Sequence, residues 1–329
     1  MAVFLTRRRF LAASAAALAT QSALARGAAA AAALSPRERV NRALAGRDVD
    51  RLPISLWHHF GLEKDGPARH AQATLSFHRD YRTDLVKVMS DFPFPKPAGA
   101  WHEVRVTDDP FPQQVQALAA VRDGLQRSAH FVETIFNPWN VAEKLSSPAD
   151  VQRLRIEQPQ KLLDALEAIA RSEAAHARRA LNAGASGVFL AIANAQPQIL
   201  SRGDYATFSA PFDRIVLDAV KDAPLNVLHL HGDAVHLDAF YTGWPAAVIN
   251  YSAHGTKVGI DAVRARYAGV IAGGIDETRY RTLDAAALKA QADAARQQAG
   301  ARFILAPGCS VPNESLPAEL HKLHSIVGA

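Results

Sequence analysis

Three residues with metal-binding chemistry lie at the ends of two apolar runs in the C-terminal half of this 329-residue chain. One run ends in His229-Leu230-His231, and a later one ends at Cys309, which is the only cysteine. Because successive side chains of a strand point to opposite faces, His229 and His231 are expected to point the same way. Two imidazoles and a thiolate make a workable zinc set. A lone cysteine can also pack as a small apolar residue, and histidines can hydrogen-bond in a core, so the residue types alone leave both roles open.

Eight short apolar runs are predicted as the strands that position these residues. Between most of them lie stretches with helical periodicity, such as 159–183 and 283–299, and a helix is expected to begin at Pro36 with Ser35 as its cap. Strands alternating with helices predict a (β/α)8 barrel. The main alternative is a doubly wound open sheet, which is disfavoured because no glycine-rich dinucleotide-binding turn follows the first strand. The predicted strands are 52–60, 84–92, 131–136, 187–194, 226–231, 247–251, 269–275 and 302–309.

In such a barrel the chemistry lies at the C-terminal ends of the strands, where several more polar residues are predicted. Asp91 is expected to act as an acid/base group or to anchor substrate, and one of His58 and His59 is expected to assist it. The two histidines are adjacent, so only one can face inward. The predicted substrate-binding residues are Lys87, Asn137, Asn194, Asn250 and Asp276.

Two of these residues, Lys87 and Asp276, could have a structural role instead of a functional one. Lys87 and Asp91 are expected on one face of their strand, where they either pair as ions or leave Lys87 to bind an acidic substrate. Asp276 either caps the next segment of the chain or orients a zinc-bound histidine.

The N-terminus has the features of an export signal. Arg7, Arg8 and Arg9 precede an Ala-rich apolar run and a small-residue cleavage pattern that ends at Ala25. We predict a twin-arginine signal peptide over 1–25, a flexible Ala-rich segment over 26–34 and a single barrel domain over 35–329. The expected location is therefore the periplasm.

Charge and hydropathy narrow the expected partners. The signal holds three arginines and no acidic residue, so its removal lowers the formal charge from +5 to +2. No basic run with interleaved aromatic residues remains, which argues against a nucleic-acid partner. No apolar stretch reaches the roughly 20 residues that a membrane span requires.

The order of motifs resembles the uroporphyrinogen decarboxylase superfamily over nearly the whole mature chain. The matching segments are Ala43-Leu44-Ala45-Gly46, Asp50-Arg51-Leu52-Pro53, Asp84 to Asp91, Asn137-Pro138-Trp139, Leu228 to Gly232, Gly273 to Asp276 and Gly308-Cys309. The resemblance implies a (β/α)8 barrel and one of two chemistries. It also suggests a homodimer. One branch decarboxylates uroporphyrinogen without a cofactor, and the other uses zinc to activate a thiol that takes a methyl group from a corrinoid.

Departures from the decarboxylase pattern favour the zinc branch. The family's paired arginines after the first strand are absent, and its tyrosine, serine and late histidine are replaced by Lys144, Ala193 and Cys309. In the zinc branch a His-x-Cys pair and a late cysteine hold the metal; here these positions are His229, His231 and Cys309. An imidazole in place of a thiolate makes the metal a stronger Lewis acid, so hydrolytic or lyase chemistry stays open.

We therefore expect an exported zinc enzyme with methyltransferase-like chemistry on a small or tetrapyrrole-related substrate, with a corrinoid as a possible co-substrate. Two alternatives stay open. The first is a cofactor-free, decarboxylase-like enzyme that uses Asp91. The second is a non-catalytic protein that binds a tetrapyrrole, a corrinoid or a metal.

Overall fold

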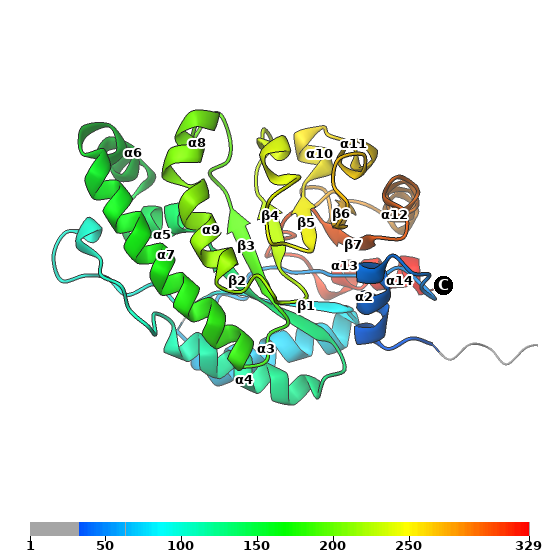
Figure 1. Cartoon of the computed structure of the whole chain (residues 1–329). Helices are drawn as coiled ribbons and strands as arrows, with labels where there is room; N and C mark the ends of the chain where they lie inside the picture. The colour runs from blue at the N-terminus through cyan, green and yellow to red at the C-terminus, as the bar shows by residue number, and fades with distance from the viewer. Residues whose placement is uncertain (1–32, 63, 329) are drawn as a thin grey trace, which may run out of the picture. The chain divides into compact units, whose positions relative to one another are not determined.

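The computed structural model describes residues 33–62 and 64–328. Seven parallel strands form one sheet in the order β1-β2-β3-β4-β5-β6-β7, so every strand pairs with its neighbours in sequence (Figure 1). The predicted signal peptide and nearly all of the predicted flexible segment lie outside the described residues and stay predictions. The strands are β1 Leu85–Val88, β2 His130–Phe136, β3 Val188–Ile192, β4 Val227–Leu230, β5 Val248–Tyr251, β6 Val270–Ile275 and β7 Phe303–Pro307.

The predicted first strand, 52–60, is wrong in extent, because it is reduced to a single bridge between Ile54 and Leu305. Pro53 has no N–H to donate, and the Ile54 N–H is bound by the Asp84 carboxylate at 2.9 Å instead of by a strand. The segment nevertheless joins β7 to β1. The Ser55 N–H donates to the Leu305 carbonyl at 3.0 Å, and the Ile54 carbonyl accepts from the Asp84 N–H at 2.7 Å. The predicted (β/α)8 barrel is confirmed with this correction.

Helices follow most strands and cover the outside of the sheet (Figure 1). The Ser35 hydroxyl caps the first described helix by accepting from the Glu38 N–H at 3.2 Å, as the sequence predicts. The helices are α2 Pro36–Ala45, α3 Gly66–Tyr81, α4 Pro112–Leu125, α5 Pro138–Leu145, α6 Pro148–Glu157, α7 Pro159–Asn182, α8 Arg202–Phe208, α9 Ala210–Asp218, α10 Ala253–Thr256, α11 Ile260–Arg264, α12 Ala285–Ala299, α13 Pro317–Leu320 and α14 Lys322–Val327, with short 3₁₀ turns at Trp101–Glu103 and Leu237–Phe240.

The alternation of side chains along β4 separates two apolar layers. Leu228 and Leu230 belong to the large layer between the sheet and its helices, whereas Val227 packs with Phe189 and Val248 inside the barrel. His229 therefore points inward with Val227, as the sequence predicts.

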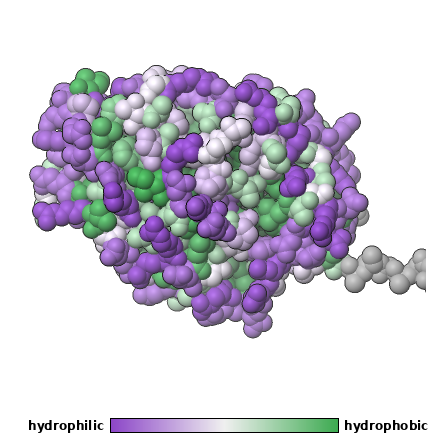
Figure 2. Space-filling view, viewed as in Figure 1, coloured by the Kyte–Doolittle hydropathy of each residue, from purple (hydrophilic) through white to green (hydrophobic). Residues whose placement is uncertain are grey.

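The surface is mainly polar on the face shown in Figure 2, with small apolar patches between hydrophilic side chains. The large apolar residues that are most exposed among those described, Val106, Ile156 and Leu316, lie far apart in the sequence. Within residues 33–62 and 64–328, no helix combines the length and the apolar character needed to cross a bilayer.

Candidate metal centre

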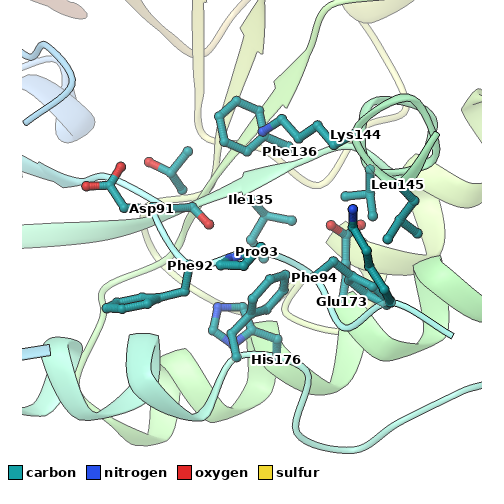
Figure 3. Close-up of a pocket in the computed structure, with 15 residues that line it drawn as sticks. Asp91, Phe92, Pro93, Phe94, Ile135, Phe136, Lys144, Leu145, Glu173 and His176 are labelled. Atoms are coloured by element: carbon teal, nitrogen blue, oxygen red, sulfur yellow. The ribbon is translucent and has the colours of Figure 1, made fainter. Parts of the chain in front are cut away.

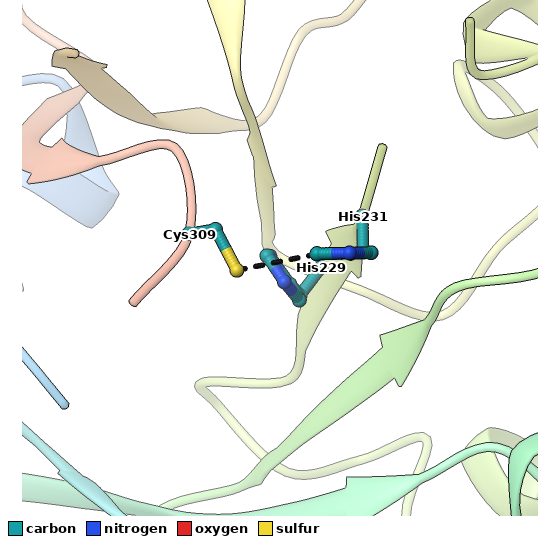
Figure 4. Close-up of side chains that lie close together, drawn as sticks. All are labelled: His229, His231 and Cys309. Atoms are coloured by element: carbon teal, nitrogen blue, oxygen red, sulfur yellow. Dashed lines mark hydrogen bonds between the residues drawn. The ribbon is translucent and has the colours of Figure 1, made fainter. Parts of the chain in front are cut away.

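The three predicted metal ligands come together at the C-terminal end of the barrel. His229 lies on β4, His231 directly follows that strand, and Cys309 lies two residues after β7 (Figure 4). One ligand atom from each residue can be chosen so that all three lie within 4.8 Å of one another. The His231 Nδ1 atom is 3.2 Å from the Cys309 Sγ atom. Ligand atoms on one tetrahedral zinc ion are about 3.5 Å apart, so small side-chain rotations suffice to bind the ion.

Gly308 allows Cys309 to reach this position. A Cβ atom on Gly308 would lie 2.4 Å from the Ser252 Cα atom and 2.7 Å from the Glu277 carboxylate. Only glycine permits this close approach of the chain after β7 to the end of β5.

Asn250 fixes the orientation of His229 from behind. The Asn250 Nδ2 group donates to the carbonyls of Ala272 and Pro307 at 3.0 and 3.1 Å, so its Oδ1 atom must face the imidazole. That oxygen lies 2.5 Å from His229 Nδ1, which therefore carries the proton. The Nε2 atom of His229 keeps its lone pair for a metal ion, an arrangement typical of metal-binding histidines. Asn250, predicted to bind substrate, is fully buried and contacts the His229 ring.

The electrostatics of the cluster favour a thiolate. Burial alone would raise the pKa of Cys309, but without a bound metal the protonated forms of His229 and His231 donate hydrogen bonds to the sulfur, and these bonds together with their positive charge lower the pKa to about 4. The hydrogen bond to Cys309 in turn raises the pKa of His231. One thiolate and two imidazoles form a donor set that zinc accepts, so the residues present fit the metal.

The three ligands line a cavity of about 240 Å³ that also holds two lysines. Burial lowers the pKa of Lys87 to about 7 and that of Lys144 to about 8. The Lys87 Nζ atom lies 2.9 Å from Met89 Sδ and 4.6 Å from the centre of the Phe189 ring, and Lys144 Nζ lies 3.0 Å from the centre of the Phe136 ring. Among the described residues, neither lysine forms an ion pair with a carboxylate. The other lining residues are Trp57, His59, Thr134, Asn140, Ala191, Ala193 and Ser310.

Lys144 is a pocket residue that the sequence indicated only as a replacement for a tyrosine. It lies on α5, which begins immediately after β2 at Asn137-Pro138. Such a position, in the helix that follows a barrel strand, was the signal that could have found it.

The predicted acid/base residues separate into three locations. His59 lines the metal cavity, and burial followed by the charge of Lys87 lowers its pKa. His58 faces away and packs against the rings of Phe60 and Phe77, each 5.2 Å from it between ring centres. Asp91 lines a neighbouring cavity.

Asp91 is paired there with a histidine and not with Lys87. His70 Nε2 lies 3.2 Å from Asp91 Oδ2, at ion-pair distance but without hydrogen-bond geometry. The alternative in which Lys87 and Asp91 neutralise each other is therefore not what the described residues show.

Three residues predicted to bind substrate lie outside the metal cavity and bind other parts of the chain. Asn137 donates to Asn194, Ser209 and Asp213 through its Nδ2 atom, at 2.8, 3.1 and 3.0 Å, in a fully buried network. Asp276 accepts from the Thr278 N–H at 3.1 Å and from its hydroxyl at 2.7 Å, so it caps the turn after β6. Asn137, Asn194 and Asp276 are absent from the lining of the metal cavity.

The sequence matches the uroporphyrinogen decarboxylase (URO-D) family over residues 93–329. The chain belongs to this family. No curated protein sequence gives a significant match.

Solved structures of proteins with low sequence identity show the same fold as this URO-D family chain. A methyltransferase from Methanosarcina mazei superposes with a TM-score of 0.70 at 16% identity, covering 89% of this chain and 98% of its own. A Listeria monocytogenes protein assigned as a vitamin B12-independent methionine synthase superposes with a TM-score of 0.51 at 10% identity, covering 84% of this chain and 95% of its own. At these identities the likeness establishes the fold.

Proposed function

We propose that this URO-D family protein is a zinc enzyme that transfers a methyl group to a small anionic thiol, with His229, His231 and Cys309 as the metal ligands. The observation that carries the proposal is the meeting of three ligand atoms within 4.8 Å, at the end of the barrel where such enzymes do their chemistry. The likeness to a methyltransferase agrees with this branch of the family.

The bound zinc would supply Lewis acidity that keeps a substrate thiol ionised near neutral pH. The protein's own residues would position that substrate. Lys87 and Lys144 would hold its anionic group, because both ammonium groups face the cavity without a carboxylate partner. The aromatic walls formed by Trp57, Phe136 and Phe189 would exclude water.

The proposed transfer balances with one methyl donor and one thiol. The new bond joins the substrate sulfur to the methyl carbon, and the bond between that carbon and the donor breaks. The donor, which we propose is a methylated corrinoid, keeps the electron pair of the broken bond. The thiol proton leaves to solvent through His59, whose lowered pKa keeps it neutral and able to accept a proton.

Metal content tests the site directly. Wild-type protein, purified without a histidine tag or chelator, should contain about one zinc per chain by plasma mass spectrometry. Cys309→Ser and His231→Gln should lose most of that zinc. His254→Gln is the matched control, because His254 also lies near a strand end but binds the Gly274 carbonyl at 3.2 Å. Zinc-free wild type, or full zinc in Cys309→Ser, would refute the assignment.

A charge-matched pair of substrates tests the reaction. With methylcobalamin as donor, 3-mercaptopropionate should be methylated with a lower KM than the neutral 3-mercapto-1-propanol. Lys87→Gln should raise the KM for the anionic thiol about tenfold and leave that of the neutral thiol almost unchanged. Equal KM values for the two thiols in the wild type would contradict the anion site, and no methylation of either would contradict the proposed transfer.

A further inference from the structure

A second cavity, of about 200 Å³ (Figure 3), lies beside the metal cavity. The two cavities share Thr134, Phe136 and Lys144 in their linings. Its walls come from the ends of β1 and β2 and from helices α5 and α7. Pro93 and Lys96 are exposed and form its mouth, and Lys144 is also exposed, whereas Asp91, Glu173 and His176 are buried. For comparison, an apolar cavity of about 150 Å³ binds benzene, so this chamber has room for one small organic molecule.

Glu173 is an acidic residue in this chamber without a partner. It lies on the buried face of α7, is 1% exposed, and its buried Oε2 atom has no hydrogen-bond partner. Lys144 does not neutralise it; Figure 3 shows the Lys144 side chain directed toward the Phe136 ring. Burying a carboxyl group without a partner is unfavourable in free energy, and an apolar residue at this helix position would avoid it. A ligand that donates a hydrogen bond to Glu173 would offset this unfavourable term.

His176 offers a second acceptor in the same chamber. Its Nε2–H group donates to the Glu133 carboxylate at 2.9 Å, and Gln114 holds that carboxylate from its other side at 2.8 Å. In the neutral imidazole the remaining Nδ1 atom is therefore an acceptor, and this atom is buried without a partner. Two unpartnered acceptors in one cavity call for a ligand group that is rich in donors.

The other charges around the chamber also favour a positive ligand. Asp91 lines it, and Asp213 is close enough to Glu173 to raise the pKa of that carboxyl further, after the larger effect of burial. Lys144 opposes them from the boundary with the metal cavity, and Lys96 is exposed at the mouth. Lys96 and Lys144 are both exposed, whereas Asp91 and Glu173 are buried, so the buried part of the lining is acidic.

Aromatic rings form much of the remaining wall. Phe94 and Phe111 pack edge to face, with 5.7 Å between ring centres, and Phe92 and Phe136 also line the cavity. The faces of such rings attract organic cations as well as apolar groups.

We propose that this chamber binds a protonated amine on a short apolar stem, with the Glu173 carboxylate as its counter-ion and His176 Nδ1 as a second acceptor. The stem packs among the phenylalanine rings. The site needs no metal, so it stands apart from the function proposed above.

Three probes of one shape and different charge test the site on the full chain. Benzylammonium, benzyl alcohol and benzoate should be titrated calorimetrically near neutral pH. Benzylammonium should bind at least about tenfold more tightly than benzyl alcohol, because a charged hydrogen bond replaces a neutral one, and benzoate should not bind measurably. Tightest binding by benzoate, equal binding of all three, or no binding of any probe would overturn the proposal.

Variants identify the residue responsible. Glu173→Gln keeps the shape of the side chain and should reduce benzylammonium affinity to that of benzyl alcohol. Glu167→Gln is the control, because Glu167 lies on the same helix but is exposed and paired with Arg171. Metal-free Cys309→Ser should bind benzylammonium as the wild type does, so failure of the zinc site and failure of this site are distinguishable. Unchanged benzylammonium affinity in a folded Glu173→Gln protein would also overturn the proposal.

Discussion

Two polar clusters at the C-terminal ends of the strands look alike in the sequence and differ in the structure. After β2 and β3, Asn137 and Asn194 bind each other and the Ser209 hydroxyl, and Asn137 also binds the Asp213 carboxylate. At β4 and β7, His229 and Cys309 direct their ligand atoms into an open cavity.

The difference arises from the segments that come after each strand. The first cluster meets α8 and α9, which supply a hydroxyl and a carboxylate that satisfy every amide donor. The metal cluster has no carboxylate or amide partner on its cavity side among the described residues, and Asn250 binds His229 from behind. A polar residue at a strand end is therefore a site candidate only where the next segment leaves it unpaired.

The largest effect on stability is expected in the cluster formed by Asn137, Asn194, Ser209 and Asp213, whose polar groups bind one another. Asn137→Ala removes the donor of three buried hydrogen bonds, and the Asp213 Oδ1 atom loses its hydrogen-bond partner. The free energy of unfolding should fall by about 3 kcal/mol, measured by urea denaturation. Zinc content should not change. A loss of zinc without a loss of stability would reverse the roles assigned to the two clusters.

The next prediction compares zinc binding in variants of two asparagines that are equally buried. Asn250→Ala releases the His229 ring and should weaken zinc binding about 10- to 100-fold, measured by competition with a chelating dye. Asn194→Ala is the matched control and should keep the wild-type zinc affinity, because Asn194 binds only within the other cluster. Equal zinc affinities in the two variants would show that Asn250 does not orient a ligand.

A smaller effect concerns Lys87, whose ammonium group lies at the metal cavity without a carboxylate partner. Burial lowers its pKa from 10.5 to about 7, so between these values the unfolded chain binds a proton that the folded chain has released. The stability contributed by this group therefore rises with pH above about 7, by at most about 1.4 kcal/mol per pH unit.

The variant Lys87→Met should remove that rise, and urea denaturation of metal-free protein at several pH values measures it. Lys289→Met is the control, because Lys289 is exposed and paired with Asp293. The same dependence on pH in Lys87→Met and the wild type would show that Lys87 is solvated in the folded protein.

The sequence predicted the strands well because their apolar runs and the polar residues that end them are local signals. His229 and His231 were placed correctly by the alternation of side chains along one strand. The first strand was predicted too long, because Pro53 and the reach of the Asp84 carboxylate to the Ile54 N–H matter only after folding.

The roles of Asn137, Asn194 and Glu173 could not be predicted from the sequence. Asn137 and Asn194 are satisfied by Ser209 and Asp213, which lie far along the chain. In the sequence Glu173 looks like any other charged residue of a helix. That its buried Oε2 atom has no hydrogen-bond partner becomes visible only in the packed structure. Whether a buried polar group has a partner is decided by tertiary contacts, and local patterns do not encode them.

X-ray absorption at the zinc edge of wild-type protein tests the metal assignment most directly, because it reads the donor atoms around the metal. We predict one sulfur at about 2.3 Å and at least two nitrogen donors at about 2.0 Å, with the sulfur absent from any zinc that Cys309→Ser retains. A shell of nitrogen and oxygen alone in the wild type would contradict the assignment.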